Sequence, residues 1–396
     1  MLDVRPLTPG DYDAADRLDA LAFGATVEEV RAGPAVESGR RRWGAFEDGR
    51  LVGGATDLFH EQWWGGLVIQ ASGIAGVAVE AERRGDGIAT KLMLAAMHDA
   101  RERGAAVANL FCTSSAVYRA MGFEVGGLRR TVVLPTAALR QRPPDGVRVR
   151  SGDGRDWPYI RTVYDDIARS GNGFLTRRGP LFAEPAGDDL PAGIDGLTIA
   201  EDAAGRVVAY ATWRRGKGYR ADAVLSVYDC LALTVSGAAA VLKVLSGWET
   251  VAPTTRIRLL PWLDAVASML PIERAREDSS EVWMHRPIDV TRAVEGRGWP
   301  PGLRGSVEFT LVDEQLPWNA GGWRLELADG AGRLERLRDE PDCRLDVRGW
   351  SALWCGAAGS AHLRQAGMLV GGDVESQQRL DLLLGGGGRA GLLDYF

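Results

Sequence analysis

The chain has 396 residues, of which 45% are hydrophobic and 25% charged, and its formal net charge is −6. This composition is ordinary for a globular protein long enough for two or three domains, and the acidic balance argues against binding of nucleic acid through its phosphates. No apolar run is long enough to cross a membrane, residues 1–7 lack a signal-peptide core, and the four cysteines have no metal-ligand spacing, so we expect a cytoplasmic protein without a metal site.

The first predicted elements are a strand over residues 2–7 and an amphipathic helix over residues 11–21. Residues 23–42 lack a clear period and are expected to be irregular. Two strands follow, 43–47 and 50–60, and the Asp48-Gly49 pair between them is typical of a hairpin turn.

Two adjacent tryptophans, Trp63 and Trp64, stand in a glycine-bearing segment before the next predicted strand, residues 67–71. A substrate entrance and a subunit contact are both compatible with such a pair. The sequence does not decide between them.

Residues 73–94 are the stretch around which the chain is organised. An apolar run from Ile74 to Val79 predicts a buried strand, and a helix is predicted from Ile88 to the stop at Gly104. The paired glycines between them, together with Arg83 and Arg84, favour binding of an anion, because a glycine turn lets backbone N–H groups approach a phosphate at a helix N-terminus.

Two common nucleotide-binding motifs do not fit this turn. Thr90 stands where a Rossmann fingerprint has its third glycine, and the Gly-Lys-Ser/Thr of a P-loop is absent. The stretch instead resembles the strand, Arg-Gly-x-Gly turn and helix of the GCN5-related N-acetyltransferases (GNAT). Glu82 departs from that family's usual Gln or Arg, and an ordinary strand–turn–helix is the alternative. The predicted strand 107–112, helix 114–121 and strand 128–134 complete such a core, which we place at residues 1–135.

After a predicted linker, residues 135–144, the pattern starts again. A second, degenerate GNAT-like domain is predicted over residues 145–287, and its helix 236–246 has no Arg-Gly-x-Gly turn before it, which favours a scaffold over a second active site. Its other predicted elements are a strand at 147–150, a helix at 153–170, a glycine- and proline-rich excursion at 171–191, and strands at 198–202, 207–213 and 223–232.

Residues 288–396 place their predicted strands, the first of them at 305–312, before most of their helices, which indicates a small α+β unit. The unit resembles the sterol-carrier-protein-like domain that ends one acetyltransferase subfamily. Gly385–Gly388 is expected to be a mobile segment leading to an apolar tail that finishes at Phe396. The predicted fold class is thus α/β (α+β): a GNAT domain, a GNAT-like domain and a sterol-carrier-protein-like domain.

The three units together resemble the Eis (enhanced intracellular survival) N-acetyltransferases over the whole length. The resemblance implies transfer of an acetyl group from acetyl-CoA, as co-substrate, to a primary amine such as an aminoglycoside or another polyamine-like small molecule, and a homohexamer. It also implies a tyrosine general acid, matched by Tyr118, and a C-terminal carboxylate as general base, matched by Phe396. The residues that match the family's cofactor contacts are Val77, Ala78, Val79, Arg84, Gly85, Asp86, Gly87, Ile88, Ala89, Thr90, Thr113 and Ser114.

The substrate side matches the family less well. Phe23 fits an aromatic position of the amine pocket, but Ala25 stands where an acidic residue is expected, and only the nearby Glu28 and Glu29 could replace it. A protein-lysine acetyltransferase is an alternative that uses the same chemistry. A binding protein for an apolar ligand is a second alternative, based on the C-terminal unit.

Overall fold

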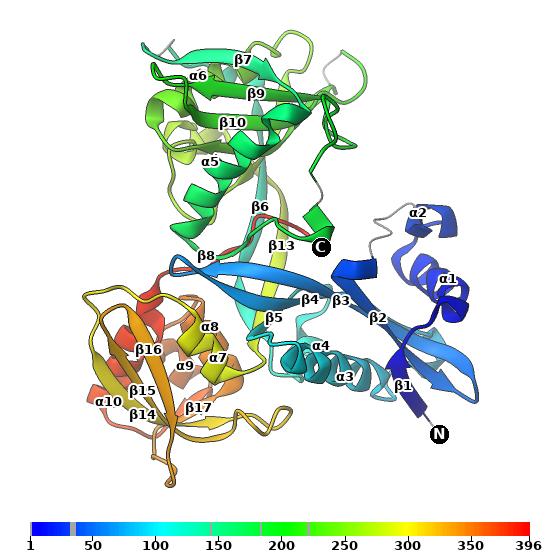
Figure 1. The fold of residues 1–396 in the computed structure, drawn as a ribbon, viewed down its shortest axis with the longest axis vertical. Helices are drawn as coiled ribbons and strands as arrows, with labels where there is room; N and C mark the ends of the chain where they lie inside the picture. The colour runs from blue at the N-terminus through cyan, green and yellow to red at the C-terminus, as the bar shows by residue number, and fades with distance from the viewer. Residues whose placement is uncertain (1, 32–36, 143–144, 183, 220–221) are drawn as a thin grey trace.

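The computed structural model describes residues 2–31, 37–142, 145–182, 184–219 and 222–396. In this part of the chain the strands form two sheets, one of thirteen strands and one of five (Figure 1). The large sheet runs through two successive α/β units, and the small sheet belongs to the third unit. The mixed α/β class predicted from the sequence is confirmed.

The first unit follows the predicted order of strands and helices closely. One difference is α2, which lies in the segment expected to be irregular; residues 32–36 of that segment fall outside the described residues. The elements are β1 (Leu2–Pro6), α1 (Tyr12–Phe23), α2 (Val27–Arg31), β2 (Arg40–Glu47), β3 (Arg50–Trp64), β4 (Leu67–Val79), α3 (Ile88–Glu102), β5 (Val107–Phe111), α4 (Ser115–Arg119) and β6 (Glu124–Pro135).

Trp63 and Trp64 are not in a loop, because β3 continues to Trp64 while paired with β4. Both indoles are buried, Trp63 among residues of the second unit and Trp64 in the core that it shares with the third unit. The ring of Trp64 lies 5.2 Å from that of Trp354, centroid to centroid. The two tryptophans therefore hold the units together and form neither a substrate entrance nor a subunit contact.

The second unit contains three strands that the sequence analysis missed, β8, β12 and β13. Each is held by a partner far away in the sequence, and none has a clear alternation of apolar and polar residues over its whole length. The elements are β7 (Arg148–Gly152), α5 (Trp157–Arg169), β8 (Asn172–Leu175), β9 (Gly196–Glu201), β10 (Val207–Arg214), β11 (Val224–Ala232), α6 (Val235–Ser246), β12 (Thr254–Leu259) and β13 (Arg276–Pro287).

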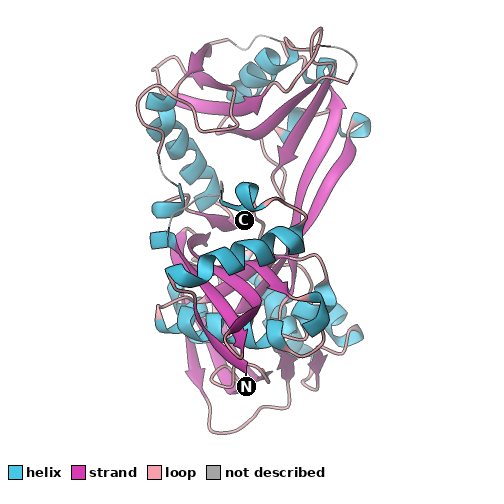
Figure 2. Ribbon diagram, turned by 90° about the vertical axis from the view of Figure 1, so that its right-hand side faces the viewer, coloured by secondary structure: helices cyan, strands magenta, loops and turns pink. Residues whose placement is uncertain are grey.

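The first two units share the middle of the large sheet, whose order is β1-β2-β3-β4-β5-β13-β6-β12-β11-β10-β9-β7, with β8 as the thirteenth strand paired to β3 outside this order. β13 lies beside β6 (Figure 1) and pairs with β5 on its other side. β6 in turn pairs with β12. Seen from the side, strands continue from one unit into the other (Figure 2). The boundaries at 135 and 145 stay predictions, and strand pairing crosses them. In the predicted linker, of which residues 143–144 lie outside the described part, Thr136 is buried and bonded to Thr255 Oγ1 at 2.9 Å.

The third unit packs its helices against a separate sheet in the order β16-β15-β14-β17-β18. The prediction that strands mostly precede helices here is confirmed. Its elements are α7 (Val290–Gly296), β14 (Gly305–Val312), β15 (Gly321–Ala328), β16 (Ala331–Arg336), β17 (Arg344–Asp346), α8 (Val347–Trp354), α9 (Ser360–Gln365), β18 (Leu369–Val370) and α10 (Val374–Leu383).

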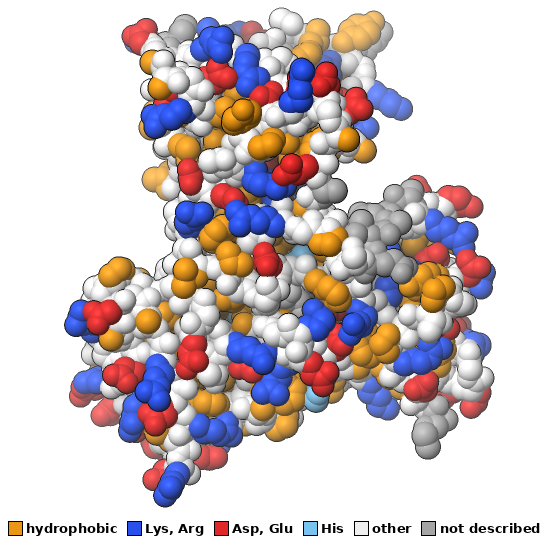
Figure 3. All heavy atoms as spheres, viewed as in Figure 1, with side chains coloured by type: hydrophobic (Ala, Val, Ile, Leu, Met, Phe, Trp, Pro, Cys, Tyr) orange, Lys and Arg blue, Asp and Glu red, His pale blue; other side chains and the backbone are white. Residues whose placement is uncertain are grey.

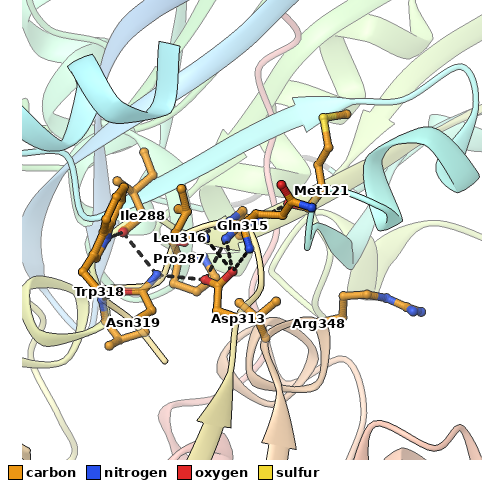
Figure 4. A network of polar contacts seen from close by, with 12 residues as sticks. Met121, Pro287, Ile288, Asp313, Gln315, Leu316, Trp318, Asn319 and Arg348 are labelled. Carbon is orange, nitrogen blue, oxygen red and sulfur yellow. Dashed lines mark hydrogen bonds and ion pairs between the residues drawn. The ribbon is translucent and has the colours of Figure 1, made fainter. Parts of the chain in front are cut away.

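A buried ion pair attaches the third unit to the large sheet (Figure 4). Arg286, in β13, donates from Nη2 to both carboxylate oxygens of Asp313 at 2.6 and 2.7 Å, and from Nη1 to the carbonyl of Met121. Asp313 also accepts the backbone N–H of Leu316 and the amide of Asn319. Both charged side chains are fully buried, so the pair fixes the orientation of the third unit.

The chain beyond Leu384 is held by contacts with the other units. In the glycine segment, which was expected to be mobile, Gly385–Gly387 form a 3-10 turn and the carbonyl of Gly387 accepts from Asn172 Nδ2 at 2.6 Å. Ala390 N donates to Cys355 O at 2.8 Å, Gly391 N donates to Asn172 O at 2.9 Å, and Leu392 and Leu393 are buried. Glycine is needed for close approach here, because a Cβ on Gly391 would lie 2.1 Å from Pro261 Cγ. The tail ends at the junction of the units in both ribbon views (Figures 1 and 2).

Positively and negatively charged side chains are interspersed over the face shown in Figure 3, as expected for a chain with a small net charge. Among the described residues, no helix combines the length and apolar character needed to cross a membrane. The same residues contain no cluster of three or more His, Cys, Asp or Glu side chains that could hold a metal ion.

Candidate active site

The parallel strands β4 and β5 separate partway along their length. They pair only from Ala71 opposite Val107 to Gly73 opposite Asn109, and beyond Gly73 the ladder of β4 runs with β3 alone. A bulge at Gly76, which has a φ of +58°, shifts the register with β3 at this point. Val77–Val79 therefore have one strand edge without a partner strand. Such an edge can bind an extended amide-containing chain through backbone hydrogen bonds.

The turn after β4 leaves an open space at the N-terminus of α3. Gly85 and Gly87 have φ values of +94° and +73°, and no atom lies within 4 Å of a Cβ built on either. Gly87 is the N-cap of α3 and provides no side chain, so the N–H groups of Ile88, Ala89 and Thr90 have no helical acceptor. These N–H groups and the helix dipole suit an anion.

The two arginines of this turn are not equivalent. Arg83 is paired with Asp86, at 2.8 Å, and with Glu47, so its charge is largely used within the protein. Arg84 is exposed and has no ion pair within the described ranges. Glu82, the departure noted in the sequence, is also exposed, and its side chain makes no hydrogen bond or ion pair with another residue that the structure describes. Arg84 is thus the cation available to an anion at this turn.

Tyr118 lies in α4, the short helix that follows β5. Its ring is half-buried and lies 6.3 Å from that of Phe123, in an edge-on arrangement. Burial raises the pKa of the Tyr118 hydroxyl above its ordinary value of 10, and the neighbouring Cys112 acts in the same direction. The phenol is therefore protonated near neutral pH and can act as an acid. Thr113 and Ser114 are exposed between β5 and α4, and Ser114 is the N-cap of α4.

The tail brings Phe396 to the end of β5. The ring of Phe396 lies 5.5 Å from Phe111, the last residue of β5, and 4.6 Å from His60. Tyr395 stacks on Phe111 at 4.6 Å, and Arg129 Nε donates to the carbonyl of Leu393 at 2.8 Å. The last residue is therefore fixed beside the separation of β4 and β5.

His60 is a site residue to which the sequence analysis gave no role. It lies in β3, is buried, and is one of the two aromatic neighbours that hold the ring of Phe396. Burial lowers its pKa from 6.5 to about 4, although Asp394 acts in the opposite direction, so the imidazole is neutral at physiological pH. No local sequence signal could have found it, because its partner comes from the other end of the chain.

Phe23 is not brought to this group of residues by any contact between described side chains. It is the last residue of α1 and is 55% exposed. Of the two acidic residues near Ala25, Glu29 accepts the backbone N–H of Thr26 at 2.8 Å and so caps α2. The role of Phe23 in binding an amine stays a prediction.

Comparison with known proteins identifies the first unit. Residues 3–126, which contain β4, the glycine turn, α3 and α4, match the acetyltransferase (GNAT) domain family. The chain carries a GNAT domain. Residues 290–390 match the sterol carrier protein domain, so the predicted nature of the third unit is also confirmed.

Full-length relatives agree with these two matches. An uncharacterized N-acetyltransferase of Streptomyces avermitilis is 28% identical, over 92% of each chain. A GCN5-related N-acetyltransferase from Kribbella flavida, whose crystal structure is known, is 27% identical with a TM-score of 0.86, over 100% of this chain and 98% of that one. The protein is an N-acetyltransferase of the GNAT type.

Eis1 from Mycobacterium abscessus shares the fold over 100% of both chains, with a TM-score of 0.77 and 19% identity. At this identity the likeness shows the fold alone. The assignment to the Eis family stays a prediction.

Proposed function

We propose that this enzyme transfers the acetyl group of acetyl-CoA to a primary amine of a small molecule, with Tyr118 as general acid and the carboxylate of Phe396 as general base. The observation that carries the proposal is the position of Phe396 against Phe111, where β4 and β5 separate beside the open glycine turn. In this proposal the donor, the acid and the base meet at this opening.

The residues present fit acetyl-CoA, which supplies the activated acetyl thioester. The unpaired edge at Val77, Ala78 and Val79 suits the amides of the pantetheine arm. The backbone from Gly85 through Asp86 and Gly87 to Thr90 has the open space and free N–H groups that a pyrophosphate requires, and Arg84 adds a cation. Thr113 and Ser114 are exposed beside the same opening and can make further polar contacts.

The proton transfers balance with these two groups. A new N–C bond forms as the amine attacks the acetyl carbonyl, and the C–S bond of the thioester breaks. The carboxylate of Phe396 takes the proton released by the amine, and the Tyr118 hydroxyl donates a proton to the leaving sulfur. Proton exchange with water restores both groups, and the products are the N-acetylated amine and CoA with a free thiol. A backbone N–H of β4 is available to the carbonyl oxygen as negative charge develops on it.

The acceptor is proposed by class only. The sequence resemblance to the Eis enzymes favours amine-bearing small molecules, including aminoglycosides, and a hexamer. Ala25 argues against a strongly cationic acceptor, because an acidic side chain is expected at its position. Lysine in a protein is the other acceptor class. A thiol-release assay with aminoglycosides, small polyamines and lysine peptides separates the two classes, and sedimentation tests the hexamer.

Gly87→Glu tests the cofactor site. A carboxylate at the N-cap of α3 would occupy the position of the pyrophosphate, so we expect acetyl-CoA binding, measured by calorimetry, to be lost in a folded protein. Gly104→Glu is the matched control, since Gly104 also has a positive φ and nothing within 4 Å of its Cβ but lies at the opposite end of α3. Equal acetyl-CoA affinity in both variants would contradict the proposed site.

A further inference from the structure

A cavity of about 410 Å³ lies in the second unit, outside the residues that match the GNAT domain. Sites for small molecules typically have volumes of about 300–1,000 Å³ and mainly apolar and aromatic walls. The aromatic residues that line this cavity are Trp157, Tyr164, Phe182, Tyr210 and Tyr228. The size and lining therefore suit a small aromatic molecule.

The cavity occupies the position in the second unit that corresponds to the β4–β5 opening of the first. β11 and β12 are parallel and pair only from Val224 opposite Thr254 to Val227 opposite Ile257. The cavity is lined by the next residues of both strands, including Tyr228 and Arg258. The second unit has thus kept the opening between the two strands.

The phosphate-binding turn has not been kept. Thr234 is the N-cap of α6, and its side chain accepts the N–H of Gly237 at 3.0 Å. At the start of α6 this backbone N–H is therefore hydrogen-bonded to a side chain, whereas the corresponding N–H at the start of α3 is free. The occupant of this cavity is not expected to be a nucleotide.

Most polar groups around the cavity already have partners. Arg177 Nη2 bonds Asp229 Oδ1 at 3.0 Å and Asp394 Oδ1 at 2.9 Å. The hydroxyl of Tyr210 donates to Asp229 at 2.9 Å, and that of Tyr164 donates to the carbonyl of Leu175 at 2.7 Å. These groups form a closed network and leave no donor for a ligand.

Arg258 is a charged group of the lining that lacks such partners among the described residues. Its guanidinium lines the cavity, its Nε is buried, and it has neither a hydrogen bond nor an ion pair with any residue in the part of the chain that the structure describes. Burial lowers the pKa of Arg258 from 12.5 to about 10, and Arg129 adds to this effect; the carboxylates of Asp229 and Asp394 oppose it without cancelling it. Arg258 is a half-buried cation whose Nε is a buried donor without an acceptor, which is costly unless an acceptor completes it.

We propose that this cavity binds a small aromatic carboxylate, with the carboxylate on Arg258 and the ring against the aromatic walls. The planar fork of a guanidinium matches a carboxylate in a two-bonded geometry, and tyrosine and tryptophan faces accept a flat ring. The site also touches the tail, because Arg177 in its wall pairs with Asp394, two residues before Phe396. This binding does not depend on the proposed catalytic roles of Tyr118 and Phe396.

Calorimetric titration of the full chain with benzoate, 3-phenylpropionate and indole-3-acetate tests the proposal, with the corresponding neutral amides as matched probes. We expect at least one carboxylate to bind, and its amide to bind roughly tenfold or more weakly, since hydrogen bonds to a charged group contribute at least that much. Arg258→Gln should weaken the carboxylate by a similar factor, and Arg258→Lys should weaken it less, because it keeps the charge.

Arg256→Gln is the control variant. Arg256 lies two residues away on β12 but is ion-paired with Asp278 at 2.5 Å, so its replacement should leave the carboxylate affinity unchanged. Thermal unfolding should show little loss of stability in Arg258→Gln, because the change breaks no hydrogen bond or ion pair with the described residues and removes only a contact at 5.9 Å with the ring of Tyr228. Three results would overturn the proposal: no carboxylate saturating in the millimolar range, equal affinity for a carboxylate and its amide, or unchanged affinity in Arg258→Gln.

Discussion

At the scale of single residues, the protein buries two histidines that have to remain uncharged. His285 is fully buried among Trp64, Trp283 and Trp350, and neither ring nitrogen has a hydrogen-bond partner in the described structure. Burial, with a smaller contribution from Arg297, lowers its pKa from 6.5 to about 3. Because the unfolded chain protonates this imidazole more readily than the folded chain does, the free energy of unfolding depends on pH.

The first prediction concerns the acid sensitivity of folding. Below pH 6.5 the unfolded chain protonates His285 while the folded chain does not until about pH 3, so stability is full above 6.5 and falls through this window. His285→Phe should reduce the slope of the free energy of unfolding against pH by about 1.4 kcal/mol per pH unit. Urea unfolding of both proteins at several pH values measures it, with the slopes above this window as the internal control. Identical slopes within the window would show that the imidazole is not kept neutral.

The second prediction concerns Tyr118. Tyr118→Phe keeps the packed ring and removes the proposed acid, so kcat should fall by about 10²–10⁴-fold while acetyl-CoA affinity changes little. Tyr159→Phe, an exposed tyrosine of α5, is the matched control and should leave kcat unchanged. If kcat of Tyr118→Phe stays within roughly twofold of the parent, well below the range for acid catalysis, the residue only packs.

How far single residues could be predicted depends on the distance of their partners in the sequence. Gly85 and Gly87 were predictable, because a turn that opens a helix is a local feature, and both have the expected positive φ. His60 and Arg258 were not predictable. The partner of His60 is Phe396, at the other end of the chain, and Arg258 is distinguished by having no hydrogen-bond partner in the described structure.

At the scale of elements, the same rule explains which strands were missed. β14 was predicted with its observed bounds, because it pairs with the next strand along the chain. β13 begins with the polar residues Arg276–Ser279 and lies between β5 and β6, so the partners that stabilise it lie far away in the sequence. Its position gives β13 a second function, since the buried Arg286 near its end holds the third unit.

The third prediction tests that attachment. Arg286→Met leaves Asp313 as a buried carboxylate without its counter-ion, which typically costs about 3–5 kcal/mol. Burial already lowers the pKa of Arg286, which indicates how poorly this position is solvated. Arg324→Met is the control: Arg324 is paired with Glu308 at the surface, where such pairs contribute about 0–1 kcal/mol. Chemical unfolding that shows equal losses for the two variants would refute the structural role of the buried pair.

At the scale of the whole molecule, the tail connects all three units. It leaves the third unit after α10, pairs at Ala390 with Asn172 of the second unit, and places Phe396 against β3 and β5 of the first. Arg177 and Arg129 hold it on the way, through Asp394 and the carbonyl of Leu393. The sequence showed an apolar tail but not its path, because that path depends on how the three units are arranged.

The last prediction uses this anchoring to separate catalysis from packing. Peptide ligation can produce two versions of the protein, one ending in the carboxylate of Phe396 and one ending in a carboxamide. Both keep every side chain, so their thermal stability and their acetyl-CoA affinity should be equal. If the carboxylate accepts the proton of the amine, kcat should fall by about 10²–10⁴-fold, the usual contribution of a general base. Neighbouring rings of His60 and Phe111 hold Phe396 in both proteins, so a change in position does not explain a loss. Equal kcat for the two proteins would leave the tail a purely structural role, and the base would have to be sought elsewhere along the β4–β5 opening.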